Sequence, residues 1–353
     1  MLPFENVPDP VFFFDEGEYA RIRNRIKDSL KAGRGLIVVT GPIGSGKTTL
    51  SQMIKSDFSH EIKLIWMAEP PGNSNDLFLF IAQELGLKPS TSERVFVLRD
   101  IKDALLKINA DNGKCLVIID EAHLMSDDTL NGIRLLNNLE EGSTKLVQVF
   151  LLAQEELIDK INKPEMEPFK QRVATMEILG KMNPERIHKY ISHRIKIAEG
   201  QTSIFSDTGW KALVLAFGSG GTPRLINLLC DKSLNVAFER GKTTVDVNDV
   251  YEAAEGTGLQ KEVFHYMIAL KQKDKDKQVQ PAGKSDSIKE PEEPRKKPAP
   301  SVIRKSKTAK KSLKIPMLFL FLSILAVIAS MDFYCGKSGS PDLVTCILDL
   351  ISF

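Results

Sequence analysis

The sequence predicts an α/β fold with a parallel β-sheet core, then a small helical domain, a disordered linker and one C-terminal transmembrane helix. Over residues 1–180, short apolar runs alternate with amphipathic helical patterns, as in repeated βα units whose strands are covered on both faces. Helical periodicity fills the gaps, for example over residues 77–85 and 95–108. The strand-like runs are residues 36–40, 63–67, 115–119 and 146–152.

The strand-like runs stop after residue 180, and helical patterns continue over residues 181–260. Three or four amphipathic helices are expected here, and loops rich in glycine separate them. Asp207 and either Asp246 or Asp249 are candidates for helix N-caps or first-turn acids. The pattern predicts a small helical domain with helices near residues 185–199, 207–217, 223–239 and 247–254.

Charge is distributed unevenly along the chain. The formal net charge is only +2, yet residues 271–314 carry 15 Lys and Arg against 6 Asp and Glu. Residues 271–314 are rich in Lys, Pro, Ser and Glu and poor in aliphatic side chains, which predicts a disordered tether. The basic disordered linker is expected to cover residues 261–314. The globular part that precedes this basic segment is mildly acidic, which argues against a domain built around a nucleic-acid-binding surface.

Residues 315–331 form a charge-free run of 17, at the short end of the roughly 17–25 residues that span a bilayer. We expect a transmembrane helix over residues 315–334; a buried core helix or an aggregation-prone tail is the alternative. Six Lys and Arg between residues 304 and 314 precede the run, so the positive-inside rule places the preceding part in the cytoplasm. The N-terminus shows no secretory signal pattern. These patterns predict a single-pass protein of the inner (cytoplasmic) membrane, with residues 335–353 outside.

The four cysteines do not form a metal-binding pattern. Cys115 falls in a strand-like run and Cys230 in a helical one, so both are expected to be buried core thiols. Cys335 and Cys346 fall in the expected outer tail, where they could pair in an oxidising compartment or remain free.

A phosphate-binding pattern, GxxxxGK[ST], directly follows the first strand-like run. Glycines let the backbone curl so that successive N–H groups face phosphate oxygens, and the next helix contributes a favourable dipole. Lys47 is expected to reach the β- and γ-phosphates, and the Thr48 hydroxyl to complete a Mg²⁺ shell. The pattern predicts ATP and Mg²⁺ as cofactors. Its residues are Gly41, Pro42, Ile43, Gly44, Ser45, Gly46, Lys47, Thr48 and Thr49.

The apolar run 115–119 ends in two adjacent carboxylates, Asp120 and Glu121. Asp120 is suited to hold Mg²⁺ through its water shell, and Glu121 is suited to act as a general base on the attacking water. A helix N-cap is the alternative explanation of such a pair. His123 is expected to be structural rather than catalytic. With the phosphate loop upstream, the acid pair predicts hydrolysis of ATP to ADP and phosphate.

With these motifs and the helical domain after them, residues 1–255 resemble an AAA+ ATPase. More narrowly, they resemble the general secretion pathway protein A (ExeA-like) family and related ATPases of pilus and of exopolysaccharide or exosortase loci. Besides the two motifs, the resemblance rests on Phe4, Pro10 and Phe12 and on the runs 148–157, 169–172 and 221–227.

The resemblance implies roles for three further residues. Gln154 would be the sensor-one residue directed at the attacking water and γ-phosphate, unless it is an exposed loop glutamine. Arg172 would be an arginine finger, supplied in trans within a homo-oligomer, unless it is a surface salt-bridge partner. Arg224 would be the sensor-two arginine of the helical lid. Pro10 and Phe12 would lie beside the adenine, although apolar packing explains them equally well.

The expected function is a membrane-anchored ATPase that drives or regulates assembly of an envelope secretion, pilus or polysaccharide-export system through a membrane partner protein. A DNA-handling ATPase, similar to transposition helper or origin-recognition ATPases, is the runner-up, and nucleic-acid binding is not expected. A regulatory ATP-binding scaffold with little turnover is the third possibility. About 20 residues follow the expected span, so direct peptidoglycan binding, a feature of similar secretion proteins, is not expected.

Overall fold

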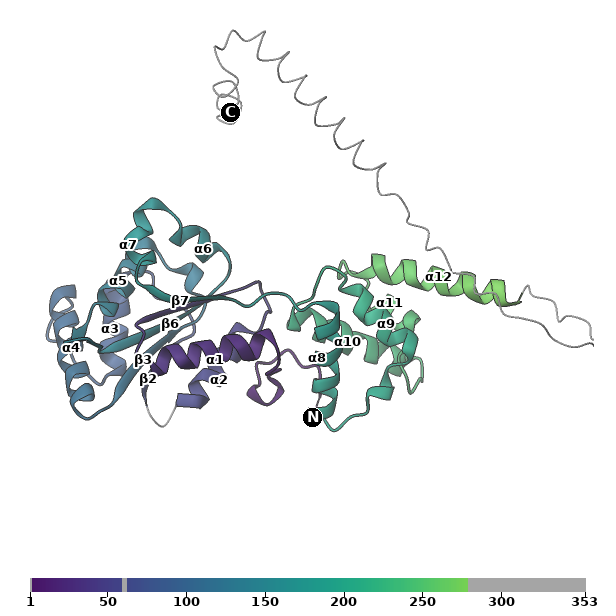
Figure 1. Cartoon of the computed structure of the whole chain (residues 1–353), viewed down its shortest axis with the longest axis horizontal. Helices are drawn as coiled ribbons and strands as arrows, with labels where there is room; N and C mark the ends of the chain where they lie inside the picture. The colour runs from purple at the N-terminus through teal and green to yellow at the C-terminus, as the bar shows by residue number, and fades with distance from the viewer. Residues whose placement is uncertain (1, 59–61, 279–353) are drawn as a thin grey trace, which may run out of the picture. The chain divides into compact units, whose positions relative to one another are not determined.

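A computed structural model describes residues 2–58 and 62–278 of the chain (Figure 1). The expected transmembrane helix, the outer tail with Cys335 and Cys346, and the linker beyond residue 278 lie outside the described residues. Within the described ranges, no helix is long and apolar enough to cross a membrane.

Five parallel strands form the central sheet, in the order β2-β3-β6-β1-β7. Four of them lie where the apolar runs predict strands. The fifth, β7, was not expected, because its residues alternate between exposed and buried positions, as an edge strand allows. The strands are β1 Leu36–Thr40, β2 Ile62–Met67, β3 Lys114–Ile119, β6 Val147–Ala153 and β7 Val173–Ile178, and a separate hairpin joins β4 Glu140–Glu141 to β5 Thr144–Lys145.

Helices cover both faces of the sheet, which explains why its central strands are almost entirely apolar. On β1, Ile37 and Val39 face one core, which the buried sides of α1 and α2 complete. Leu36 and Val38 face a second core, which α3, α4 and α5 complete. The helices of this α/β part are α1 Glu18–Lys31, α2 Lys47–Phe58, α3 Ser74–Glu84, α4 Arg94–Ala110, α5 Asp127–Asn137, α6 Glu156–Ile161 and α7 Glu167–Lys170, with short 3₁₀ turns η1 Pro10–Phe12, η2 Ala122–Leu124 and η3 Pro164–Met166.

The helical domain begins at Pro184 and agrees with the four predicted helices to within a few residues. Asp246 caps α11 and Asp249 completes a capping box there, while Asp207 lies in the first turn of α9, which Ser206 caps. Both sequence predictions of capping acids are confirmed. The helices are α8 Pro184–Ile197, α9 Asp207–Ala216, α10 Pro223–Glu239 and α11 Val247–Ala253, with the 3₁₀ turn η4 Thr202–Ile204.

A further helix, α12 Gln260–Gln278, occupies residues where the sequence analysis began the disordered linker at residue 261. Val263 on this helix is fully buried, and Tyr266, Met267 and Leu270 pack against the same core. These four positions follow helical spacing, so one narrow apolar stripe docks a helix whose overall composition is polar. The start of the linker at residue 261 was therefore placed too early.

Cys115 and Cys230 are both buried and unpaired, as predicted. Burial raises the pKa of the Cys115 thiol to about 12 and raises the pKa of Cys230 as well. Both thiols therefore stay protonated and act as core side chains.

Candidate active site

Three neighbouring strands, in the order β3-β6-β1, end at one edge of the sheet. The phosphate loop follows β1, the acid pair follows β3, and Gln154 follows β6. Thr40 pairs with Ala153, and the N–H of Gly41 donates to the carbonyl oxygen of Ala153 at 3.2 Å. The loop and Gln154 therefore leave the sheet side by side. This carboxyl edge is where open α/β sheets bind ligands.

The phosphate loop has the glycine-dependent conformation that its sequence predicts. Gly44 and Gly46 have φ angles of +75° and +95°, which side chains other than glycine rarely adopt. A Cβ at Gly41 would lie 2.4 Å from the carbonyl oxygen of Leu179. The hydroxyl of Ser45 is buried and has no hydrogen-bond partner. Together with the N-terminus of α2, these features form a cradle that fits a chain of phosphates.

Lys47, the first residue of α2, folds back over this loop. Its ammonium donates to the carbonyl oxygens of Gly41 at 2.9 Å and Pro42 at 3.1 Å. Burial lowers the pKa of Lys47, while the charges of Glu121 and Asp120 act in the opposite direction. Neutral carbonyl oxygens are weaker partners for a cation than phosphate oxygens. Lys47 is therefore placed to exchange them for the phosphates of a nucleotide.

Thr48 and Asp120 meet across the loop. The Thr48 hydroxyl donates to Oδ2 of Asp120 at 2.7 Å, and Oδ1 of Asp120 accepts from the N–H of Glu121 at 2.9 Å. Mg²⁺ favours such oxygen ligands and keeps several waters. In the described ranges, no group of three or more His, Cys, Asp or Glu side chains could hold a metal ion. Thr48 and Asp120 would supply two oxygen ligands to a magnesium ion, and phosphate and water oxygens would supply the others.

Glu121 has a left-handed backbone, with φ 50° and ψ 34°. For a residue other than glycine this conformation costs on the order of 1–3 kcal/mol, and such strain concentrates at functional sites. Its side chain makes no capping hydrogen bond to η2, so the N-cap alternative does not explain it. Instead the carboxylate, 43% exposed, lines the same cleft as Lys47.

Gln154 also lines this cleft, and its side-chain nitrogen lies 3.0 Å from Nε2 of His123. It is half-buried and bonded, unlike an exposed loop glutamine. Arg224 reaches the cleft from the helical domain: its N–H donates to the carbonyl oxygen of Gly44 at 3.2 Å, and its side chain forms part of the wall. The structure thus brings two of the residues implied by resemblance to the phosphate loop.

Arg172 lies at the other edge of the sheet. It precedes Val173, which pairs with Leu36 at the start of β1, whereas the phosphate loop follows the end of β1. Five strand residues separate these ends by about 15 Å. Arg172 is exposed, and its charge is a minor cause of the lowered pKa of Glu140, after the hydrogen bond and charge of Lys145. Arg172 is not among the residues that line the cleft.

The cleft has a volume of about 390 Å³, and part of its wall was not assigned from sequence. Arg194 on α8 is buried, stacks over the ring of Phe12 at 4.5 Å, and donates to the carbonyl oxygen of Glu5 at 3.2 Å. Tyr19 on α1 donates from its hydroxyl to the carbonyl oxygen of Ser45 at 2.8 Å. In the sequence, Tyr19 and Arg194 are marked only by their place on the buried side of an amphipathic helix. Ordinary core packing produces the same pattern. Phe12 lines the cleft, as the adenine prediction requires, whereas Pro10 is not among the lining residues.

A protein-family model described as an AAA domain matches residues 30–161, which include the phosphate loop, the acid pair and Gln154. General secretion pathway protein A of Aeromonas hydrophila is 30% identical over 262 residues, covering 74% of this chain and 48% of that protein. The chain is an AAA+ protein related to general secretion pathway protein A. An uncharacterized HTH-type transcriptional regulator of Methanocaldococcus jannaschii is 23% identical over 217 residues, covering 60% of this chain and 49% of that protein. The chain thus spans about half the length of these two relatives.

Solved structures show the same fold for this AAA+ protein. The ORC2 protein of Aeropyrum pernix has a TM-score of 0.53 at 16% identity, over 75% of this chain and 71% of that chain. Cdc6p from Pyrobaculum aerophilum has a TM-score of 0.53 at 14% identity, over 70% of this chain and 71% of that chain. At these identities the likeness establishes the arrangement of sheet and helical domain, and function must be argued from the site.

Proposed function

We propose that this AAA+ protein hydrolyses Mg·ATP and uses the cycle to drive or regulate assembly of an envelope secretion, pilus or polysaccharide-export system. The observation that carries the hydrolytic part is the convergence of Lys47, the Thr48–Asp120 pair, Glu121 and Gln154 at one edge of the sheet. The relationship to general secretion pathway protein A supports the envelope process.

Each of these residues has a separate task in the proposed reaction. Lys47 and the loop N–H groups hold the β- and γ-phosphates, and Thr48 and Asp120 hold the magnesium ion that neutralises phosphate charge. Glu121 accepts a proton from the attacking water, and the Gln154 amide orients that water. Arg224 contacts the γ-phosphate from the helical domain and reports its loss.

Phosphate release by the wild type and by Glu121→Gln tests this assignment. A general base contributes roughly 10²–10⁴-fold, so we expect at least a tenfold lower rate with fluorescent ATP still bound. Glu199→Gln is the matched control, because Glu199 is also a glutamate with positive φ, at 60°, outside the cleft lining. Equal rates in the wild type and Glu121→Gln would remove Glu121 from the mechanism. Binding without turnover in the wild type would favour the regulatory scaffold.

A homo-oligomer with Arg172 acting in trans is part of the proposal. Arg172 lies about 15 Å from the phosphate loop of its own chain, so a neighbouring copy would have to receive it. Lys47→Ala should lose ATP binding but still supply Arg172 to a neighbour. Arg172→Ala should still bind ATP but supply no arginine. Mixing the two inactive variants should restore activity. A fully active Arg172→Ala protein would instead make Arg172 a surface partner of the acidic β4–β5 hairpin.

Anchoring in the inner membrane and contact with a membrane partner protein remain proposals that rest on residues 304–334 of the sequence. Carbonate extraction of membranes should leave the full chain in the pellet and release a chain that ends before residue 315. Release of both proteins would contradict the anchor.

DNA handling is the alternative function, and filter binding at two salt concentrations separates it from the leading proposal. Binding that depends on phosphate contacts weakens steeply with salt, by roughly 10³–10⁵-fold between 50 and 200 mM for 6–10 contacts. We expect no such binding.

A further inference from the structure

His123 lies between the proposed general base and the proposed sensor. Its Nδ1 is 3.4 Å from Oε2 of Glu121, and its Nε2 is 3.0 Å from the side-chain nitrogen of Gln154. The His123 side chain is 13% exposed. One ring therefore contacts two polar groups that follow two different strands, β3 and β6.

One tautomer of a neutral ring satisfies both contacts. A carboxylate can only accept hydrogen bonds, so Nδ1 carries the hydrogen and faces Glu121, while Nε2 accepts from the Gln154 amide. The Gln154 amide oxygen is then left to accept from a water. The backbone N–H of Gln154 also points at Nδ1, at 3.5 Å, a long contact that competes with Glu121 for this nitrogen. The 3.4 Å contact with Glu121 is long as well, as catalytic hydrogen bonds often are before substrate binds.

The main chain that carries His123 is held in place from α6. The ammonium of Lys160 donates to the carbonyl oxygen of His123 at 3.2 Å and also to that of Met125. Within η2, the N–H of Leu124 donates to the carbonyl oxygen of Glu121 at 2.9 Å. Because α6 begins at Glu156, two residues after Gln154, the ring is fixed relative to the end of β6 and to Glu121 together.

We propose that His123 is a positioning residue: it holds the Glu121 carboxylate and the Gln154 amide in one orientation, so that both act on the same water. This inference rests on the proposed ATPase function and adds a physical link between the two groups. It accounts for a histidine whose polar contacts are the reactive side chains, which packing alone does not require.

The test is steady-state hydrolysis by His123→Ala, with kcat and KM measured separately. One hydrogen bond of ordinary net strength corresponds to about tenfold in rate, so kcat should fall about tenfold while KM for ATP changes less than twofold. Leu124→Ala is the control, since Leu124 is an exposed residue of the same turn; its kcat should stay unchanged. An unchanged kcat in His123→Ala would overturn the inference.

Partial recovery of the hydrolysis rate by conservative variants of His123 distinguishes a positioning role from a structural one. His123→Asn keeps a donor near the Nδ1 position, and His123→Gln keeps a polar atom near the Nε2 position. Both should be faster than His123→Ala while all three melt alike. If His123→Ala fails to fold, these two variants decide: rates equal to the wild type in both would overturn the inference.

A double-mutant cycle with Gln154→Ala completes the test. If His123 acts partly through Gln154, the double variant should lose less rate than the product of the two single losses, whereas losses that multiply fully would show independent action. The proposed function fails separately, through absent turnover in the wild type, and that result would overturn this inference with it. Normal turnover in the wild type, together with single-variant rate losses that multiply fully in the double variant, would overturn this inference but leave the proposed function standing.

Discussion

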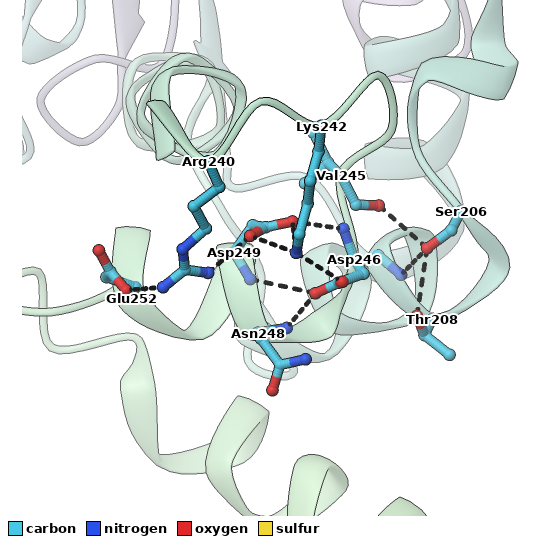
Figure 2. Close-up of polar contacts among 10 residues, drawn as sticks. Ser206, Thr208, Arg240, Lys242, Val245, Asp246, Asn248, Asp249 and Glu252 are labelled. Atoms are coloured by element: carbon cyan, nitrogen blue, oxygen red, sulfur yellow. Dashed lines mark hydrogen bonds and ion pairs between the residues drawn. The ribbon is translucent and has the colours of Figure 1, made fainter. Parts of the chain in front are cut away.

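Substituting Asp249 by alanine should strongly destabilise the helical domain. Asp249 on α11 is fully buried and joins the end of α10 to the start of α11 (Figure 2). Its carboxylate accepts from Arg240 at 2.7 Å and from Lys242 at 2.9 and 3.0 Å. It also accepts from the N–H of Asp246 at 3.0 Å, so that one side chain satisfies two cations and a helix cap.

The magnitude follows from what the substitution leaves behind. Removing one partner of a buried ion pair costs about 3–5 kcal/mol, and losing a cap costs about 1 kcal/mol. Here the side chains of Arg240 and Lys242 are 38% and 33% exposed, so water can solvate the released charges. We therefore expect the free energy of unfolding to fall by about 2–3 kcal/mol for Asp249→Ala.

The two tryptophans provide a local assay, because Trp66 lies in β2 and Trp210 in α9. In a Trp66→Phe background, Trp210 alone reports on the helical domain, where its ring packs against Phe205 and His188. With a urea slope of about 1–3 kcal/mol/M, Asp249→Ala should lower the midpoint by about 1 M.

Asp207→Ala is the matched control, since Asp207 is an exposed acid in the first turn of α9. Its substitution should change the free energy of unfolding by about 0.5 kcal/mol or less. An Asp249→Ala midpoint no lower than that of Asp207→Ala would refute the reasoning, because the buried carboxylate would then contribute no more than a solvated one.

Three further predictions concern the cleft and its surroundings. Gly44→Ala should weaken ATP binding at least tenfold, because the added Cβ would lie 2.5 Å from Cβ of Arg224 at a φ of +75°; Gly72→Ala, in open space, should bind normally in the same fluorescence titration. Tyr19→Phe should lower the free energy of unfolding by about 0.5–1.5 kcal/mol and weaken ATP binding, since a buried carbonyl of the phosphate loop loses its donor; denaturation with and without nucleotide measures both effects. Burial lowers the pKa of His193 below 6.5, so the unfolded chain binds more protons below that pH. Stability should therefore be full above pH 6.5 and fall as the pH drops toward the folded pKa, and thermal melts of His193→Gln should show a weaker pH dependence between pH 7.5 and 5.5.

The central strands could be predicted because burial on both faces leaves a local signal. Every residue of β1 and β6 is buried, so these strands are almost entirely apolar, and Thr40 and Gln148 are their polar members. The edge strand β7 has no such signal, since only every second residue faces the core. Helix α12 was mistaken for linker because its apolar stripe is narrow and its mean composition is polar.

The residues of the candidate active site also differ in whether a local sequence pattern reveals them. Gly41 to Thr49 and the Asp120–Glu121 pair are recognisable in sequence, because contiguous backbone and side chains perform their chemistry. Gln154 and Arg224 entered through resemblance, and the structure places both at the cleft. The positions of His123 and Arg194 could not be recognised in this way, since Gln154 beside His123 and Phe12 beside Arg194 lie far from them in the sequence.

By itself the sequence determined the parallel α/β core, the helical domain, the phosphate loop and the acid pair, because each depends on residues adjacent in the chain or on helical and strand periodicity. Only the tertiary structure decided that β3, β6 and β1 lie side by side. That strand order places Glu121, His123 and Gln154 within contact, and it separates Arg172 from its own phosphate loop by the length of a strand. Strand order is decided by packing between distant segments, and no local pattern in this chain encodes it.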